Sequence, residues 1–155
     1  MRDEMSDFHL KIGDEVRFAK TVGETDVYLF AGITGDFSTN HVNEQVMQGT
    51  RYGKRIAHGA LMVGYMSTAS TLAIAHTRQD ADETPVSLGY DRIRFLGAVY
   101  FGDTITVDYR IVEIDVAARR STAEIRITNQ HGQLVTVGKH ILKWVRNAPP
   151  PAAAQ

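Results

Sequence analysis

The chain has 155 residues, of which 43% are hydrophobic and 23% charged, and its formal net charge is −1. These are the proportions of an ordinary globular protein, and near-neutrality argues against polyanion binding as the main task. The absence of cysteine excludes disulfides, thiolate zinc sites and cysteine nucleophiles.

The two ends of the chain differ in composition from the rest. Residues 1–10 are expected to be an N-terminal extension, and their acidic start lacks the apolar stretch of a signal peptide, so a cytoplasmic protein is expected. Residues 147–155, with consecutive prolines followed by alanines, are expected to be a disordered tail. We therefore expect a single domain over residues 11–146.

The first part of this domain predicts one strand and two short helices. Alternating apolar residues indicate a strand over residues 15–21. Apolar residues at helical spacing, preceded by acids in the first turn, predict a helix over residues 24–33 that leads into Gly35. A further short helix, capped by Asn43, is expected over residues 43–47.

Residues 59–76 predict a long helix with apolar or small side chains on every face. Such a helix must be surrounded by protein. Tyr65 and a serine/threonine stretch interrupt the apolar run, which is too short to span a membrane. A polar loop is expected at residues 77–84.

After this loop the pattern changes to the two-residue period of strands. We expect strands at residues 87–95, 104–113, 121–129 and 134–145. Turns at residues 102–103 and 131–132 are short and predict antiparallel neighbours. The order of elements predicts an α+β fold in which one antiparallel sheet is wrapped around one long helix.

Two short segments carry groups that suit chemistry on a water molecule. Asp36 and His41 lie five positions apart in a Gly/Ser/Thr/Asn-rich stretch that makes a poor helix interior, so both are expected to project from one irregular loop. Gly59 opens the long helix, where backbone N–H groups lack partners and favour a developing negative charge. The sequence thus predicts a water site beside an oxyanion site.

Three runs, at residues 35–41, 55–59 and 93–105, carry a family likeness in this order. Together they resemble the MaoC-like dehydratases of the hot dog fold, including the short, single-domain (R)-specific enoyl-CoA hydratases. The likeness extends over about residues 10–145. In the family the first run usually reads Gly-Asp-x-Asn-Pro-x-His, whereas this chain has Ser38 and Thr39 in place of the asparagine and the proline.

The resemblance implies reversible addition of water to a trans-2-enoyl thioester, giving a 3-hydroxyacyl-CoA of (R) configuration without a cofactor. It implies that Asp36 and His41 handle the water and its proton, while the Gly59 N–H stabilises charge on the thioester oxygen. Ser67 matches a family serine that lies in the pocket. The other interpretation of Ser67 is a buried hydroxyl bonded to the preceding turn.

Two further sets of residues are candidates for binding the substrate. The acyl chain is expected to contact side chains of the long helix, namely Met62, Tyr65 and Met66. The CoA phosphates are expected to meet Arg51, Lys54, Arg55, Arg92 and Arg94. Each of these basic residues, taken alone, also has the ordinary interpretation of a solvated surface charge.

Metal binding has little support in the sequence. His41 and His58 are expected to lie far apart, no His-x3-His occurs, and the acidic residues do not cluster. His58 is expected to cap or bond locally at the start of the long helix. The histidines at 76, 131 and 140 are expected to face solvent or a strand surface.

Two other functions remain open. In a hot dog thioesterase, Asp36 would activate water against the thioester carbonyl; in a non-catalytic acyl-CoA-binding subunit, the altered residues 38 and 39 would have abolished turnover. The domain would also expose an unpaired sheet edge and a helix flank. We therefore expect at least a homodimer, with the CoA groove between subunits.

Overall fold

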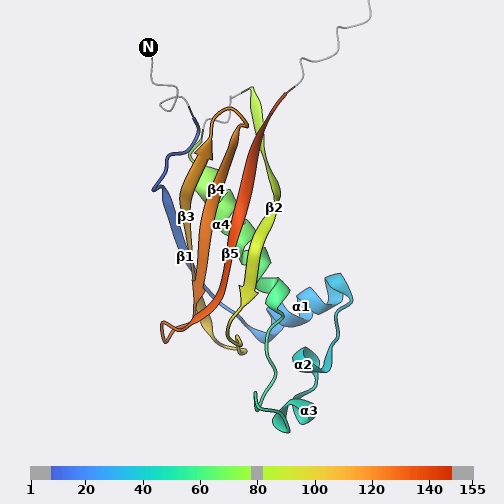
Figure 1. Cartoon of the computed structure of the whole chain (residues 1–155). Helices are drawn as coiled ribbons and strands as arrows, with labels where there is room; N and C mark the ends of the chain where they lie inside the picture. Colours follow the sequence, from blue (N-terminus) through green and yellow to red (C-terminus); the bar gives the residue numbers. More distant parts are fainter. Residues whose placement is uncertain (1–7, 78–81, 148–155) are drawn as a thin grey trace, which may run out of the picture.

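One antiparallel sheet and one long helix dominate the computed structural model, which describes residues 8–77 and 82–147 (Figure 1). The strands are β1 (Glu15–Thr21), β2 (Glu83–Phe95), β3 (Thr104–Asp115), β4 (Arg120–Thr128) and β5 (Leu134–Arg146). The helices are α1 (Glu24–Thr34), α2 (Thr39–Val42), α3 (Glu44–Gln48) and α4 (Gly59–Ile74). This confirms the predicted α+β fold with one sheet around one long helix.

The strand order is β1-β3-β4-β5-β2, so β2 pairs with β5 and not with β3. The expectation that the turn at residues 102–103 joins neighbouring strands is therefore wrong. After Phe95 the chain does not turn back to pair with β2 but runs past residues 56 and 57. The Val99 carbonyl accepts the Ala57 N–H at 2.7 Å, and Tyr100 pairs with Ile56. The turn at residues 131–132 does join the antiparallel neighbours β4 and β5.

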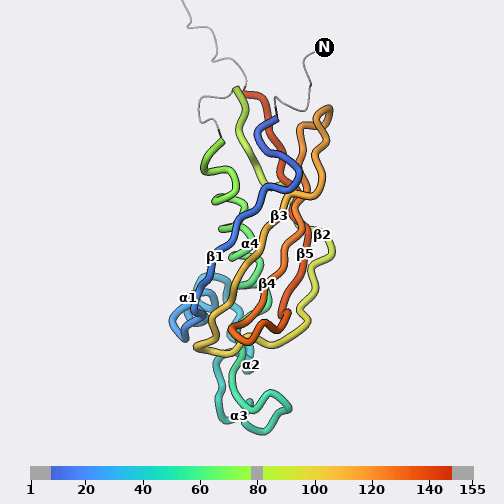
Figure 2. Tube along the Cα trace, turned by 90° about the vertical axis from the view of Figure 1, so that its left-hand side faces the viewer, coloured from blue at the N-terminus to red at the C-terminus, as the bar shows by residue number. Residues whose placement is uncertain are grey.

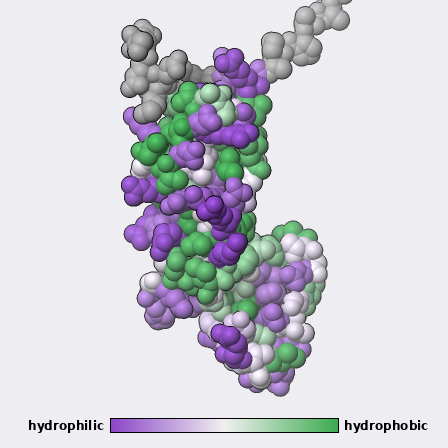
Figure 3. Space-filling view, viewed as in Figure 1, coloured by the Kyte–Doolittle hydropathy of each residue, from purple (hydrophilic) through white to green (hydrophobic). Residues whose placement is uncertain are grey.

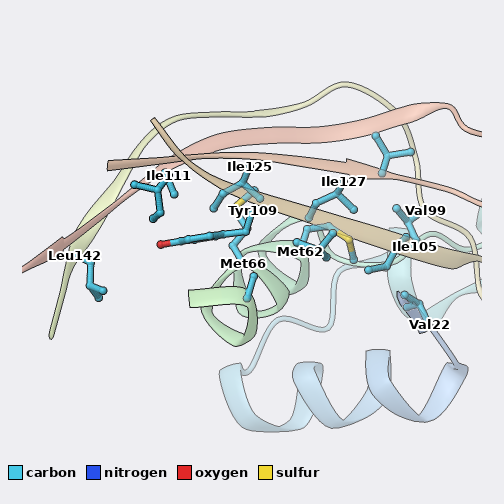
Figure 4. Packing of buried hydrophobic residues seen from close by; sticks show 14 of the residues in the cluster. Val22, Met62, Met66, Val99, Ile105, Tyr109, Ile111, Ile125, Ile127 and Leu142 are labelled. Atoms are coloured by element: carbon cyan, nitrogen blue, oxygen red, sulfur yellow. The ribbon is translucent and has the colours of Figure 1, made fainter. Parts of the chain in front are cut away.

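The core lies between α4 and the facing side of the sheet (Figure 4). Alternate residues of β3 point inward, among them Ile105, Val107 and Tyr109, and α4 contributes Met62 and Met66. Each fully buried side chain of this size stabilises the fold by about 1.5–3 kcal/mol. The opposite side of the sheet, in view in Figure 3, carries hydrophilic residues with apolar ones between them.

The N-terminal end of the described chain joins this core. Phe8 and Leu10, which belong to the range expected to precede the domain, are buried. Phe8 packs edge-on against Trp144, with ring centroids 5.0 Å apart. The tail expected at residues 147–155 lies outside the described residues except for Asn147, whose N–H donates to the Asp82 carbonyl at 2.8 Å.

Helix α4 is not enclosed on every face within one chain, contrary to expectation. The sheet covers one face, and α1 to α3 gather at one end of the molecule near the start of α4 (Figure 2). The remaining face carries small, exposed residues: Ala60, Gly64, Ser67, Thr68 and Thr71. Among the described residues no helix has the length and apolar character needed to cross a membrane.

His140 is fully buried, so the expectation that it faces solvent or a strand surface is wrong. Its Nε2 lies 2.8 Å from the Ser87 hydroxyl and its Nδ1 lies 2.9 Å from the Tyr109 hydroxyl. The Tyr90 ring stacks on it at 4.6 Å. Burial lowers the pKa of His140 to about 4, so the ring is neutral at physiological pH.

Residues close in sequence determine both ends of α1 and the start of α3. The Gly23 N–H donates to the Asp26 carboxylate at 2.8 Å, and α1 ends where Gly35 takes φ +81° and donates to the Ala31 carbonyl. Asn43 caps α3 as predicted, accepting the Val46 N–H at 3.1 Å. The stretch expected to be an irregular loop instead contains α2, which puts His41 on a helical turn.

A charged cluster ties the N-terminal segment to the far end of the sheet. Glu83 accepts hydrogen bonds from both Arg119 Nε, at 2.9 Å, and Arg119 Nη2, and it lies 2.8 Å from His9 Nε2. The His9 ring in turn stacks on Trp144 at 5.1 Å. Only 9% of the Glu83 side chain is exposed, and the hydrogen bonds from Arg119 lower its pKa to about 2.

This cluster predicts an acid-sensitive contribution to stability. A carboxyl whose pKa is depressed in the folded state stabilises fully above its ordinary pKa of 4.5, and the contribution disappears as the pH falls from there toward 2. We expect Glu83→Gln to lower the free energy of unfolding by about 2 kcal/mol at pH 7 and by much less at pH 3. Urea denaturation at both pH values measures this, with Glu113→Gln, an exposed β3 carboxylate, as the control. Equal losses at pH 7 and pH 3 would contradict the prediction.

Candidate active site

Residues 55–59 run between two segments that are distant in sequence and bond to both. The Ile56 N–H donates to the Asn40 carbonyl at 3.0 Å, and the Ala57 N–H donates to the Val99 carbonyl at 2.7 Å. Gly59 then begins α4. The loop that carries Asp36, the start of α4 and the segment after β2 therefore meet at one end of the sheet (Figure 1).

His41 is held in one tautomer. Its Nδ1 lies 2.7 Å from the Ile56 carbonyl oxygen, and since a carbonyl can only accept, Nδ1 carries the hydrogen and donates it. The neutral ring then has an unprotonated Nε2 that can accept a hydrogen bond. The side chain is 9% exposed and lines a cavity of about 550 Å³.

Asp36 follows directly after the glycine that ends α1. One carboxylate oxygen accepts the Ser38 N–H at 3.2 Å, and 53% of the side chain is exposed. A carboxylate oxygen of Asp36 and a ring nitrogen of His41 lie within 4.8 Å of each other. Two acceptors at this separation can share one water molecule, because each of its hydrogen bonds spans about 2.8 Å. The fold thus brings together the pair that the sequence singled out.

His58 occupies the N-cap position of α4, but the expectation that its side chain caps or bonds locally there is wrong. Its side chain makes no capping bond; instead its Nε2 donates to the Asp36 carbonyl at 2.9 Å. The ring is 2% exposed and stacks on His41, with centroids 3.7 Å apart and planes at 29°. The extended backbone of His58, with ψ 133°, directs the side chain toward the loop rather than over the first turn of α4.

The same contacts overturn the expectation that His41 and His58 lie far apart. Together with Asp36 they place three potential ligand atoms within 4.8 Å of one another. The donor set nevertheless does not suit a resident metal ion. The His58 Nε2 hydrogen faces the Asp36 carbonyl oxygen and the His41 Nδ1 hydrogen faces the Ile56 carbonyl oxygen, so one nitrogen of each ring is already used as a hydrogen-bond donor.

Gly59 lies on the cavity wall at the first turn of α4. A Cβ at this position would come within 2.8 Å of the Phe95 ring, so the close approach of this ring requires glycine. In the part of the chain that the structure describes, no acceptor outside the helix is assigned to the Gly59 N–H. The amide can therefore donate to an oxygen that enters the cavity.

The structure places the three residues predicted to contact the acyl chain, and the predicted pocket serine Ser67, in different surroundings. Met62 lines the cavity, whereas Met66 is fully buried in the core beside Gly138. Tyr65 packs against the core, and burial raises its pKa to about 12, but it does not line the cavity. Ser67 lies on the exposed face of α4, so its interpretation as a buried hydroxyl is wrong.

Of the basic residues predicted to meet the CoA phosphates, some lie at the cavity and others lie away from it. Arg51 lines the cavity, and Lys54 Nζ lies 4.7 Å above the ring of Tyr100, another lining residue. Arg92 lies at a shallow hollow on the sheet with residues of β4 and β5, and Arg94 donates to the neighbouring Ile93 carbonyl. Neither Arg92 nor Arg94 lines the cavity.

Arg55 is committed to contacts within the protein and is not a solvated surface charge. Its guanidinium donates to Glu24 of α1 at 2.7 Å and to Glu44 of α3 at 2.8 Å. It also donates to the Tyr28 hydroxyl and lies 4.7 Å above the Phe101 ring. Arg55 therefore clamps the helical segments that surround His41.

Sequence reasoning assigned no role to two residues that shape the cavity, Phe95 and Tyr100. Both belong to the third run of the family likeness, in which only Arg94 was given a function, as a candidate for the CoA phosphates. The sequence signal that could have pointed to them is the pair of aromatic residues at 95 and 100, with Gly97 and Ala98 between them. Their approach to Gly59 and Lys54 depends on the path of the chain after β2.

Comparison with known proteins agrees with this geometry. Residues 7–133 match the family model described as MaoC like domain. An (R)-specific enoyl-CoA hydratase of Rhodospirillum rubrum is 38% identical over 98 residues, which cover 63% of this chain and 62% of that relative. The (R)-specific enoyl-CoA hydratase of Aeromonas caviae is 26% identical over 139 residues, 90% of this chain and 98% of that enzyme.

A solved structure supports the fold in the same way. The (R)-hydratase from A. caviae, described as involved in PHA biosynthesis, superimposes with a TM-score of 0.77 at 24% identity. The superposition covers 86% of this chain and 96% of that structure. The shared arrangement is the hot dog fold, a sheet wrapped around one long helix.

The contact between Gly59 and Phe95 predicts a steric coupling. We expect Gly59→Ala to destabilise the protein by about 1–3 kcal/mol, because the new methyl group displaces the ring. In a Phe95→Ala background the same change should cost less, which thermal unfolding of the two single variants and the double variant measures. Gly32→Ala in α1, where nothing lies within 4 Å of the added carbon, is the control and should not destabilise. Additive losses at 59 and 95 would rule out the contact.

Proposed function

The chain belongs to the family of MaoC-like domains, and from this premise we propose that it is a hydro-lyase acting on enoyl thioesters. It adds water reversibly to a trans-2-enoyl-CoA and forms a 3-hydroxyacyl-CoA of (R) configuration. Relatives named (R)-specific enoyl-CoA hydratase support the reaction class. The observation that carries the proposal is the pairing of Asp36 with His41, within water-bridging distance, beside the glycine that opens α4.

The acid–imidazole pair holds the attacking water. The Asp36 carboxylate and the unprotonated Nε2 of His41 both accept hydrogen bonds, so one water donates a hydrogen to each and turns its oxygen lone pair outward. As this oxygen bonds to C3 of the substrate, the pair takes one proton from the water and a proton is delivered to C2. The net change is addition of OH at C3 and H at C2, with the enzyme unchanged.

Gly59 stabilises the charge that the attack creates. Electron density moves from the double bond to the thioester oxygen, and the N–H at the start of α4 donates to it, helped by the helix dipole. A donor of this kind contributes about 3 kcal/mol of transition-state stabilisation. Phe95 excludes water from one side of this contact, since its ring packs against the glycine.

Substrate binding uses fewer residues than the sequence suggested. Arg51 and Lys54 meet the CoA phosphates near the cavity, beside the aromatic rings of Tyr52 and Tyr100. Arg55 is unavailable because two carboxylates occupy it. The acyl chain enters past Met62, while Ser67, on the open face of α4, acts only where a second subunit covers that face.

The protein forms at least a homodimer. Strand β2 lies at an edge of the sheet, and its Leu88 and Phe95, together with Leu96 directly after it, are exposed by half or more. The adjoining face of α4 is lined by small, exposed residues. A second copy, related by a two-fold axis, would cover both the unpaired edge and this face.

The first test is hydration of a panel of enoyl-CoAs, followed by loss of absorbance of the conjugated thioester. We expect the wild type to hydrate at least one of them, and Asp36→Asn and His41→Ala to fall below about a thousandth of its rate, because the two groups act as a unit. Near-normal rates in both variants would rule out the assigned pair. Release of free CoA thiol would instead indicate a thioesterase, and binding without any turnover would indicate an accessory subunit.

The second test is the oligomeric state, measured by size-exclusion chromatography with light scattering. We expect a dimer or larger assembly, and we expect Leu88→Glu on the β2 edge to shift it toward monomer and to reduce activity. Ile12→Glu, which changes an apolar residue before β1 that is 61% exposed against 50% for Leu88, is the control and should leave both unchanged. A wild-type monomer with full activity would contradict the proposal.

A further inference from the structure

We infer that His58 is a positioning residue, whose ring fixes the backbone of Asp36 against the start of α4 and so sets the acid–imidazole pair relative to the Gly59 amide. The inference rests on the proposed hydration for its kinetic consequences and on the structure alone for its geometry. His58 precedes Gly59 directly, so any shift of its ring is transmitted over one residue to the oxyanion donor.

The bonds of the two histidines are reciprocal. His41, from α2, donates to the Ile56 carbonyl of the segment before α4, at 2.7 Å. His58, from that segment, donates to the Asp36 carbonyl of the loop, at 2.9 Å. The two rings stack between these bonds at 3.7 Å, so each segment is tied to the other in both directions.

Asp36 depends on this bond because its other hydrogen bonds stay within residues 34–38; its own N–H donates to the Thr34 hydroxyl at 3.3 Å. Its carboxylate is 53% exposed and accepts one bond from within its own loop, the Ser38 N–H at 3.2 Å. It follows Gly35, whose left-handed conformation ends α1. The His58 bond to the Asp36 carbonyl is therefore the contact that links this residue to α4. A misplacement of about 1 Å in such a group lowers the rate by about 100-fold.

Packing alone does not explain a histidine at position 58. The ring is enclosed between His41 and Phe30, whose centroid lies 4.7 Å away, and a phenylalanine would fill the same space. Histidine instead buries an Nδ1 that has no hydrogen-bond partner among residues 8–77 and 82–147. An unpaired buried nitrogen is unfavourable, so a side chain needed only for packing would avoid it. What histidine supplies at this position, and phenylalanine would not, is the Nε2–H that donates to the Asp36 carbonyl.

The test compares two substitutions that differ in this donor. His58→Phe keeps a ring that can stack and removes the N–H; His58→Gln removes the ring and keeps an amide N–H that can reach the Asp36 carbonyl. We expect kcat to fall about 100-fold in His58→Phe with KM nearly unchanged, and to recover to within about tenfold of wild type in His58→Gln. Thermal unfolding of both variants checks that they are folded.

A second measurement does not depend on activity. Hydrogen exchange of the amides at residues 36–41 should be faster in His58→Phe than in wild type and close to wild type in His58→Gln. Unchanged exchange in His58→Phe, or wild-type kcat with only a lower melting temperature, overturns the inference. Equal loss of kcat in two folded variants overturns it as well, because the donor would then not matter. A wild type that hydrates no enoyl-CoA is a failure of the proposed function alone, and the exchange comparison still decides the role of His58.

Discussion

The structure of the site depends on the backbone of residues 55–59, which is bonded on both sides. Arg55 holds α1 and α3 through two carboxylates, Ile56 exchanges bonds with the loop at Asn40 and His41, and Ala57 donates to Val99 after β2. Because polar backbone groups must be paired when they are buried, this segment cannot shift without breaking bonds to both neighbours. The bonds of this segment therefore also fix the position of Gly59 at the start of α4.

The same arrangement separates the molecule into a closed part and an open part. The sheet and one face of α4 enclose an apolar core, whereas the β2 edge and the opposite face of α4 remain uncovered within one chain. The cavity with His41 and Gly59 lies at the end of α4 where α1 to α3 gather. Phe95 and Leu96 line this cavity and are also among the exposed apolar residues at the β2 edge, so the cavity lies next to a surface that one chain leaves uncovered.

Predictions from the sequence succeeded where the determinants are local. Strand β1, the start of α1 and the Asn43 cap of α3 follow from alternation, first-turn acids and a single side-chain acceptor within a few residues. They failed where the partner lies far along the chain. The neighbour of β2, the burial of His140 and the carboxylates around Arg55 all depend on such contacts. Ser87 and His140 are 53 positions apart, and Arg55 is 31 positions from Glu24 and 11 from Glu44. No short-range pattern contains that information.

The sequence by itself determined the elements, the α+β class and the pairing of Asp36, His41 and Gly59 as candidates, because periodicity, caps and residue chemistry are properties of short segments. Only the tertiary structure decided which of the candidates meet. It brought His58 against His41 and Asp36, turned Arg55 away from solvent, and left α4 open on one face. The physical reason is that hydrogen bonds and stacking between distant segments are set by the path of the whole chain.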